Sequence, residues 1–129
     1  MGYTHYWRKE KKLDEVKWAG FVADVKEVYE QAGDAIAFEY DQLLRPPHAD
    51  ERFVRFNGVE EAGHETFYFE RLMVPAKWQT PDEQGRWFAF CKTAEKPYDD
   101  YVVQVLKLAK QHFGDAIELS SDGGDEVFA

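Results

Sequence analysis

One short stretch, FCKTAEKPYDD at residues 90–100, gathers side chains that could hold an anion. Its side-chain donors are Lys92, Thr93 and Lys96, and a helix is expected to begin near Pro97. The free N–H groups and the dipole of a helix N-terminus also favour negative charge. The stretch contains no glycine, which excludes a Gly-rich phosphate loop. Two interpretations remain: a side-chain-assisted anion site, or a strand-to-helix turn whose charges are solvated.

Other candidates join this stretch if the neighbouring strands share one direction. We expect strands at 3–7, 87–91 and 116–120, and in a parallel arrangement their C-terminal ends meet at one edge of the sheet. Ligands of open sheets with crossovers bind at that edge. The residues that would lie there beside the lysines are Arg8, Ser121 and Asp122.

A nucleotide is one small anionic ligand that would suit such a site, because aromatic residues lie next to the donors. Stacking of a base on an aromatic ring contributes about 1–3 kcal/mol. In this hypothesis the lysines hold phosphate, Ser121 or Asp122 contacts the sugar, and the chain is a non-enzymatic binding protein. The residues expected to stack on the base are Tyr3, His5, Trp7 and Tyr98.

His64 and Glu65 support an alternative, a small nucleotide hydrolase that uses them as acid and base. The same pair could bind a metal together with His48 and Asp50, but the spacing matches no zinc pattern. A loop-capping pair is the simpler interpretation of His64 and Glu65.

Ser120–Ser121 lacks the G-x-S-x-G elbow, which argues against a serine hydrolase. We expect no metal and no cofactor.

The acidic composition limits the partners of this chain. Its 129 residues include 25 acidic and 16 basic side chains, and the formal net charge is −9. A field of that sign repels a polyphosphate backbone, so general DNA or RNA binding is disfavoured. A small nucleotide remains possible because it needs only a few local donors.

The single cysteine, Cys91, lies in an expected strand and cannot form an internal disulfide. A buried thiol in a reducing compartment explains it better than a catalytic nucleophile. No apolar run has the length of a signal peptide or a membrane span. We therefore expect no membrane association and a cytoplasmic location.

Hydrophobic periodicity predicts the helices, and alternation predicts the strands. Apolar residues recur at spacings of three and four over 14–31 and again over 97–112, which indicates two helices. Further strands are expected at 36–40, 52–56 and 66–70.

Together these elements predict an α+β fold. We expect a two-layer sandwich in which a mixed β-sheet of about five to six strands carries two helices on one face. The length is that of a single domain, 1–121, followed by a polar C-terminal tail at 122–129. The aromatic face that the helices leave bare needs a cover, from a long loop at 75–86, a flat ligand or a second subunit. A homodimer or higher homo-oligomer is therefore expected.

Six short segments spread over nearly the whole chain are distinctive: GYTHYW at 2–7, FNG at 56–58, HETF at 64–67, FCKTA at 90–94, KPYD at 96–99 and SSDG at 120–123. They resemble a family of small uncharacterised bacteriophage and bacterial proteins. The resemblance implies no activity and no catalytic residues, but small phage proteins often bind or block a host component. Combined with the nucleotide-binding hypothesis, this setting suggests a counter-defence protein that sequesters a nucleotide signal. The acidic charge also suits a protein-interaction module that inhibits a host enzyme.

Overall fold

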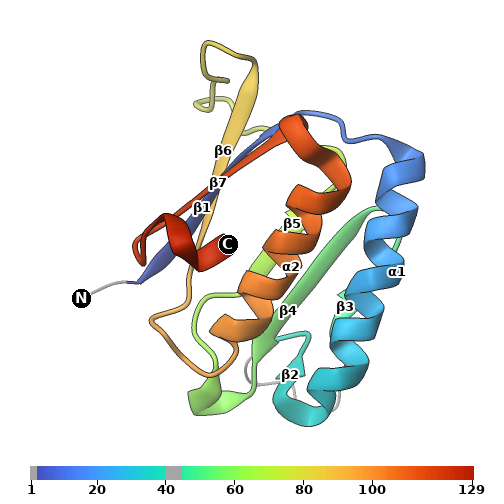
Figure 1. Ribbon diagram of the computed structural model, residues 1–129, viewed down its shortest axis with the longest axis vertical. Helices are drawn as coiled ribbons and strands as arrows, with labels where there is room; N and C mark the ends of the chain where they lie inside the picture. Colours follow the sequence, from blue (N-terminus) through green and yellow to red (C-terminus); the bar gives the residue numbers. More distant parts are fainter. Residues whose placement is uncertain (1–2, 40–44) are drawn as a thin grey trace.

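The computed structural model describes residues 3–39 and 45–129 and shows an α+β fold with two helices and seven strands in these ranges. The helices lie side by side in front of the strands (Figure 1), so the expected fold class is confirmed. Neither helix is long and apolar enough to cross a membrane. The helices are α1 Glu15–Ala32 and α2 Asp99–Phe113, and the strands are β1 Thr4–Glu10, β2 Ile36–Ala37, β3 His48–Ala49, β4 Phe53–Gly58, β5 Phe67–Glu70, β6 Arg86–Lys92 and β7 Ile117–Ser121.

Both helices form where periodicity predicts them, because each buries one apolar stripe and ends at a glycine. The Asp14 carboxylate accepts a hydrogen bond from the Lys17 N–H (2.9 Å) at the start of α1. Gly33 and Gly114 follow the two helices with φ of 56° and 54°, which glycine adopts without strain. The buried stripes are Trp18, Phe21, Val22, Val25, Val28 and Ala32 on α1, and Val102, Val105, Leu106, Ala109 and Phe113 on α2.

β1 is the middle strand of a three-stranded sheet in the order β6-β1-β7, and it runs antiparallel to both neighbours. The expectation that 3–7 runs parallel to 87–91 and 116–120 is therefore wrong. The crossover through α2 makes β6 and β7 parallel to each other. It does not fix the direction of β1, which lies between them and runs the opposite way. The C-terminal end of β1 consequently lies away from the C-terminal ends of β6 and β7.

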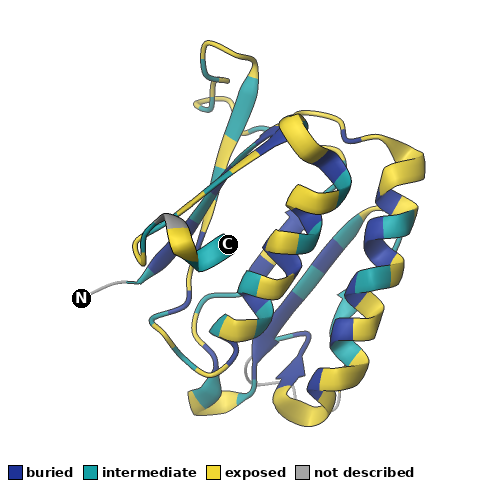
Figure 2. Cartoon of the chain, in the orientation of Figure 1, coloured by how far each residue is buried: buried dark blue, intermediate teal, exposed yellow. Residues whose placement is uncertain are grey.

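The other four strands form a second sheet, in which β4 pairs with β2, β3 and β5. The sheets join just after β1, where the Leu13 N–H donates to the Arg71 carbonyl oxygen (3.0 Å) and the Met73 N–H donates to that of Lys11 (2.8 Å). Buried residues, dark blue in Figure 2, occur on both helices and in both sheets, and they form one shared core. Its largest apolar members include Trp7, Trp18, Phe21, Phe67 and Phe69.

The segment expected as a strand at 36–40 is shorter in the structure. Only Ile36–Ala37 pairs with β4, and Tyr40 lies outside the described residues, as do residues 1 and 2. The expected long loop at 75–86 is confirmed up to the start of β6, and it carries the exposed Trp78.

The expected polar tail at 122–129 folds back onto the domain. Its last residues form a 3-10 turn, η4 Asp125–Phe128. The ring of Phe128 packs against the core, and the Lys107 ammonium donates to the Ala129 carbonyl oxygen (2.9 Å). Apolar burial by Phe128 thus outweighs the polar composition of the segment.

Candidate functional site

β1 sends alternate side chains to opposite sides of its sheet, and this places two of the four expected stacking residues in the core. His5 and Trp7 face inward and are buried. Tyr98 is also buried, and its hydroxyl donates to the Glu65 carbonyl oxygen (2.5 Å). Tyr3 is half-buried, with its ring 5.2 Å from that of His5. These positions correct the expectation of stacking, because the rings of His5, Trp7 and Tyr98 are not accessible to a ligand.

The outward side chains of β1 and β6 form an aromatic surface, here called the open face. It comprises Tyr6, Arg8, Phe88, Phe90 and Lys92. Tyr6 stacks on Phe88 with 5.9 Å between ring centroids, and Phe88 lies 6.0 Å from Phe90. Phe88 and Phe90 are 40% and 45% exposed. Sequence reasoning recognised β6 as an aromatic strand but did not identify these rings as candidates. Alternation along β1 and β6 indicates which residues share a face of the sheet, but it does not indicate which face the helices cover.

Arg8 and Lys92 flank the aromatic rings of the open face. The Arg8 guanidinium carbon lies 4.9 Å from the Phe88 centroid, and the Lys92 ammonium lies 5.8 Å from the Phe90 centroid. β1 pairs Arg8 with Phe88 and Thr4 with Lys92, so about 13 Å of strand separates the two basic positions. Arg8 is therefore not the close neighbour of Lys92 that parallel strands would have made it, but both cations share one face.

The stretch 90–100 is a strand-to-helix turn whose polar groups bond mainly to one another. The Thr93 hydroxyl donates to the Asp99 carboxylate, and the Lys96 N–H donates to the Thr93 carbonyl oxygen (3.0 Å). Acidic residues, Asp99 among them, occupy the first turn of α2, where their charge already meets the helix dipole. A ligand anion would be repelled there, so the geometry disfavours the expected anion site at the helix start. Lys96 is partly buried, and Lys92 is the exposed lysine of the turn.

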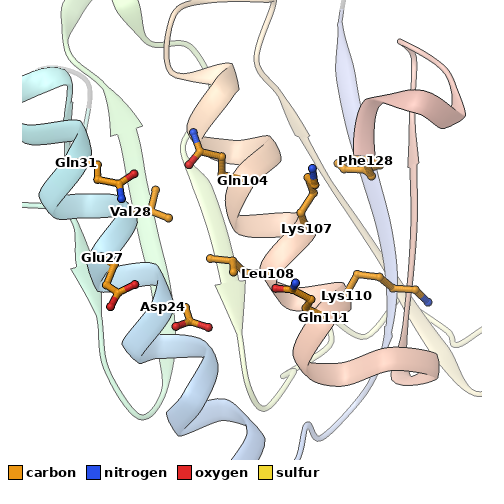
Figure 3. A pocket seen from close by; sticks show the side chains of 10 residues that line it. All are labelled: Asp24, Glu27, Val28, Gln31, Gln104, Lys107, Leu108, Lys110, Gln111 and Phe128. Atoms are coloured by element: carbon orange, nitrogen blue, oxygen red, sulfur yellow. The ribbon is translucent and has the colours of Figure 1, made fainter.

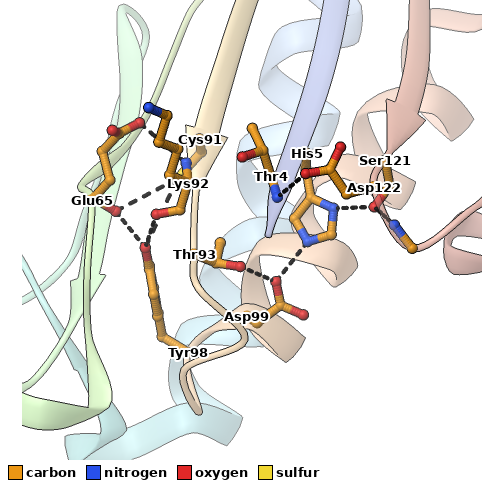
Figure 4. Close-up of polar contacts among 11 residues, drawn as sticks. Thr4, His5, Glu65, Cys91, Lys92, Thr93, Tyr98, Asp99, Ser121 and Asp122 are labelled. Atoms are coloured by element: carbon orange, nitrogen blue, oxygen red, sulfur yellow. Dashed lines mark hydrogen bonds and ion pairs between the residues drawn. The ribbon is translucent and has the colours of Figure 1, made fainter. Parts of the chain in front are cut away.

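A chain of hydrogen bonds connects β1, α2 and β7 through a buried histidine (Figure 4). His5 Nε2 lies 2.6 Å from Asp99 Oδ1, and His5 Nδ1 lies 2.9 Å from Ser121 Oγ. The Thr93 hydroxyl is a second donor to Asp99 Oδ1. Burial alone would raise the pKa of Asp99, but the hydrogen bonds from His5 and Thr93 outweigh it and lower that pKa.

Asp99 is the member of this chain that sequence reasoning did not single out. A carboxylate in the first turn of a helix is typical of interaction with the helix dipole, so its type and position gave no sign of another partner. Its contact with His5 spans 94 residues of sequence.

Asp122 bonds to the residues on either side of His5 in β1, one of which, Tyr6, belongs to the open face. One carboxylate oxygen accepts the Thr4 N–H (3.1 Å), and the other accepts the Tyr6 hydroxyl (2.9 Å). The bond to Asp122 raises the pKa of Tyr6. The carboxylate that was expected to contact a sugar is therefore engaged within the protein, where it holds the ring of Tyr6.

His64 and Glu65 belong to a loop that the buried side chain of Asn57 holds. Asn57 Nδ2 donates to the His64 carbonyl oxygen (2.9 Å), and Asn57 Oδ1 accepts the His64 N–H (3.1 Å). Glu65 Oε1 accepts the Lys92 N–H (3.1 Å), so this carboxylate caps the end of β6. The geometry supports a loop-capping role. Within 3–39 and 45–129, no group of three or more His, Cys, Asp or Glu side chains is arranged to hold a metal.

A groove of about 700 Å³ lies between α1 and α2 (Figure 3). Asp24 and Glu27 line it from α1, Lys107 and Lys110 line it from α2, and Phe128 also borders it. None of the residues that the sequence predicts for a site lines this groove. It shares no lining residue with the open face, and it meets the surroundings of His5 only at Phe128, whose ring lies 5.6 Å from that of His5.

We expect the Cys91 thiol to be unreactive in the folded protein. The side chain is buried, and burial raises its pKa to about 12. Only the thiolate attacks a disulfide reagent, so labelling by DTNB should be at least about 100-fold slower than in the unfolded chain. Thionitrobenzoate release with and without denaturant measures this ratio, and equal rates would show that the thiol is accessible.

The fold and these contacts define an α+β protein with an exposed aromatic sheet face and a Ser–His–Asp hydrogen-bond chain whose histidine is buried. No protein-family model, curated protein or solved structure matches this chain. Its function is therefore argued from the geometry of the sites themselves.

Proposed function

We propose that this protein binds, without converting it, a small ligand with a flat ring and an anionic group, such as a nucleotide, on the open face. One observation carries the proposal: the neighbouring rings of Tyr6, Phe88 and Phe90 lie at the surface between two cationic side chains. Single exposed apolar residues are normal on proteins, whereas a contiguous exposed patch is typical of a binding surface.

The aromatic rings would supply affinity by stacking. Each stack between a base and an aromatic side chain contributes about 1–3 kcal/mol. The ring of Tyr6 is held by its hydrogen bond to Asp122 (2.9 Å) and by its contact with Phe88. Rings that are already in place lose little conformational freedom on binding, which favours affinity.

The two cations would select the anionic group of the ligand. Lys92 makes no ion pair with any described residue, so its ammonium is available to a phosphate. Arg8 meets Asp82 at 3.6 Å but remains 43% exposed, and a weak surface pair of this kind is easily replaced. The net charge of −9 disfavours a long polyanion and admits a ligand with few phosphates.

The resemblance to bacteriophage proteins suggests a use for such binding. A phage protein that holds a host signalling nucleotide without cleaving it would lower the free concentration of that signal. A host defence that depends on the signal would then be blunted. This role requires binding without turnover.

Isothermal titration against mono-, di- and cyclic nucleotides tests the proposal. We expect binding heat with at least one nucleotide, and chromatography should recover that nucleotide unchanged. Phe90→Ala should weaken binding about 5- to 150-fold, the fold-change that corresponds to losing one stack. Lys92→Ala should weaken binding of the nucleotide more than binding of the matching nucleoside. Absence of heat with every nucleotide would contradict the proposal.

Tyr68→Ala is the matched control, because Tyr68 has the same 45% exposure as Phe90 but lies on β5 in the other sheet. It should leave binding unchanged. Conversion of the nucleotide would instead support the hydrolase that uses His64 and Glu65. If Phe90→Ala changes the mass measured by light scattering and not the nucleotide affinity, the open face is the interface of a homo-oligomer.

A further inference from the structure

We propose that Ser121 is an activated nucleophile for acyl transfer, with His5 as its general base and Asp99 as the residue that positions His5. The three residues come from β7, β1 and the first turn of α2 (Figure 4). They lie on the inner side of the sheet, so this site does not depend on a ligand at the open face. Their contacts span 116 and 94 residues of sequence, and tertiary structure alone assembles them.

The partners of His5 define where its protons lie. A carboxylate only accepts, so Nε2 carries the proton that is shared with Asp99 Oδ1 at 2.6 Å. In the neutral ring Nδ1 then accepts from the Ser121 hydroxyl at 2.9 Å. The Gly123 N–H donates to the same Oγ at 3.1 Å, which leaves the hydroxyl proton for His5. This is the resting arrangement of a serine nucleophile and its base.

The orientation of the imidazole differs from that of chymotrypsin-like proteases, in which Nε2 faces the serine. Either ring nitrogen accepts a proton when the other carries the hydrogen, so the reversed ring keeps the same function. The turn after β7 also lacks the G-x-S-x-G elbow. Such triads recur on unrelated folds and are recognised by geometry and roles, so neither difference excludes the chemistry.

Asp99 is held in place before any substrate binds. Its carboxylate accepts from His5 and from the Thr93 hydroxyl, and it lies where the α2 dipole favours negative charge. Burial alone would raise the pKa of Asp99, but these hydrogen bonds lower it, so the group is ionised at neutral pH. An ionised carboxylate stabilises the imidazolium that forms when His5 takes the serine proton.

The reaction that this arrangement supports is hydrolysis of a small carboxylic ester. Ser121 Oγ bonds to the carbonyl carbon while its proton passes to His5 Nδ1, and the leaving alkoxide then departs with that proton. Water next attacks the acyl-serine and gives one proton to His5, which returns it to Ser121 Oγ as the carboxylic acid leaves.

Ser121 and Asp99 are the partly exposed members of this site. Ser121 is half-buried at the end of β7, whereas His5 is fully buried. The rings of Tyr3 and Phe128 lie 5.2 Å and 5.6 Å from that of His5. They help to bury His5, and an environment of low dielectric constant strengthens its contact with Asp99.

A fluorophosphonate probe tests the proposal on the whole chain, because it phosphonylates an activated serine with loss of fluoride. We expect a single adduct by intact mass, mapped to Ser121 by peptide analysis. Asp99→Asn keeps the side-chain shape but no longer favours the proton on Nε2, and should slow labelling on the order of 100-fold or more. Ser120→Ala removes the neighbouring exposed serine and should label at the wild-type rate.

Two further measurements keep the test decisive. Circular dichroism establishes that Asp99→Asn is folded, and labelling of the unaltered chain must vanish in urea because unfolding separates Ser121 from His5. No adduct on the unaltered chain, an adduct on another residue, or equal labelling of folded Asp99→Asn would overturn the proposal. Labelling that persists in urea would overturn it as well.

Discussion

Glu70→Ala is expected to destabilise the protein by about 3–5 kcal/mol, the cost of leaving a buried charge without its partner. The Lys9 side chain is 1% exposed, and its ammonium lies 3.0 Å from Glu70 Oε1. The contact is an ion pair without hydrogen-bond geometry, and the Lys9 ammonium finds no hydrogen-bond partner within the described part of the chain. The ring of Phe69, 5.7 Å away, adds a weaker cation–π contact. Glu70 is therefore the main compensation for burying Lys9.

The pKa of Lys9 provides a second readout of the same pair. Burial lowers it below its value in the unfolded chain, and the attraction of Glu70 offsets only part of that effect. Between the folded and unfolded pKa values the unfolded chain binds more protons, so stability rises with pH in that range. Without Glu70 the folded pKa drops further, and the rise should begin at lower pH. Urea unfolding from neutral to alkaline pH measures both the loss and its pH dependence.

Lys9→Met removes the buried charge and leaves the Glu70 carboxylate, which is 20% exposed and can be hydrated, so it should cost less than Glu70→Ala. The double variant Lys9→Met/Glu70→Ala should recover most of the loss. Glu118→Ala breaks the pair with Arg86, in which Glu118 is 63% exposed, and should cost less than about 1 kcal/mol. A loss in Glu70→Ala as small as that in Glu118→Ala would show that Lys9 does not depend on Glu70.

Asp99→Ala is expected to cost about 2–4 kcal/mol, because it leaves two buried donors without their acceptor. His5 and Thr93 are both fully buried, and both bond to Asp99. Guanidinium unfolding at neutral pH measures the loss. Asp100→Ala alters the next carboxylate in the same turn, which is exposed, and should cost less than about 1 kcal/mol. Equal losses in the two variants would mean that only the helix dipole is affected.

Acid should remove the contribution of Asp99 from the unaltered protein. Burial would raise the pKa of Asp99, but the bonds from His5 and Thr93 lower it below the unfolded value. Its stabilising contribution is therefore complete above the unfolded pKa and is lost as pH falls through the folded one. Unfolding curves over that acidic range should converge for the unaltered protein and Asp99→Ala. A constant gap between them would contradict the linkage.

The helices were predictable because their signals are local. Asp14 at the start of α1 and glycine after each helix act within one or two turns, and the apolar stripes repeat along the same segment. The turn at 90–100 was predictable for the same reason. Of its side-chain donors Lys92, Thr93 and Lys96, only the Thr93 hydroxyl bonds to an acceptor within the described residues, the Asp99 carboxylate.

The direction of β1 was not predictable from its own residues. Strand signals show that 3–7 alternates, but not which way the strand runs between its neighbours. The antiparallel arrangement moved Arg8 away from Lys92 and brought Thr4 opposite Lys92. The side of the sheet that the helices cover decided that His5 and Trp7 lie in the core and that Tyr6 and Arg8 lie on the other face.

The sequence by itself thus determined the α+β class, the two helices and the turn that begins α2, because periodicity, caps and turn residues act over a few neighbouring positions. Only the tertiary structure decided that Arg8 and Lys92 flank one aromatic face, and that His5 lies between Asp99 and Ser121. Those contacts depend on strand direction and register, and burial of a shared core sets both over separations near the length of the chain.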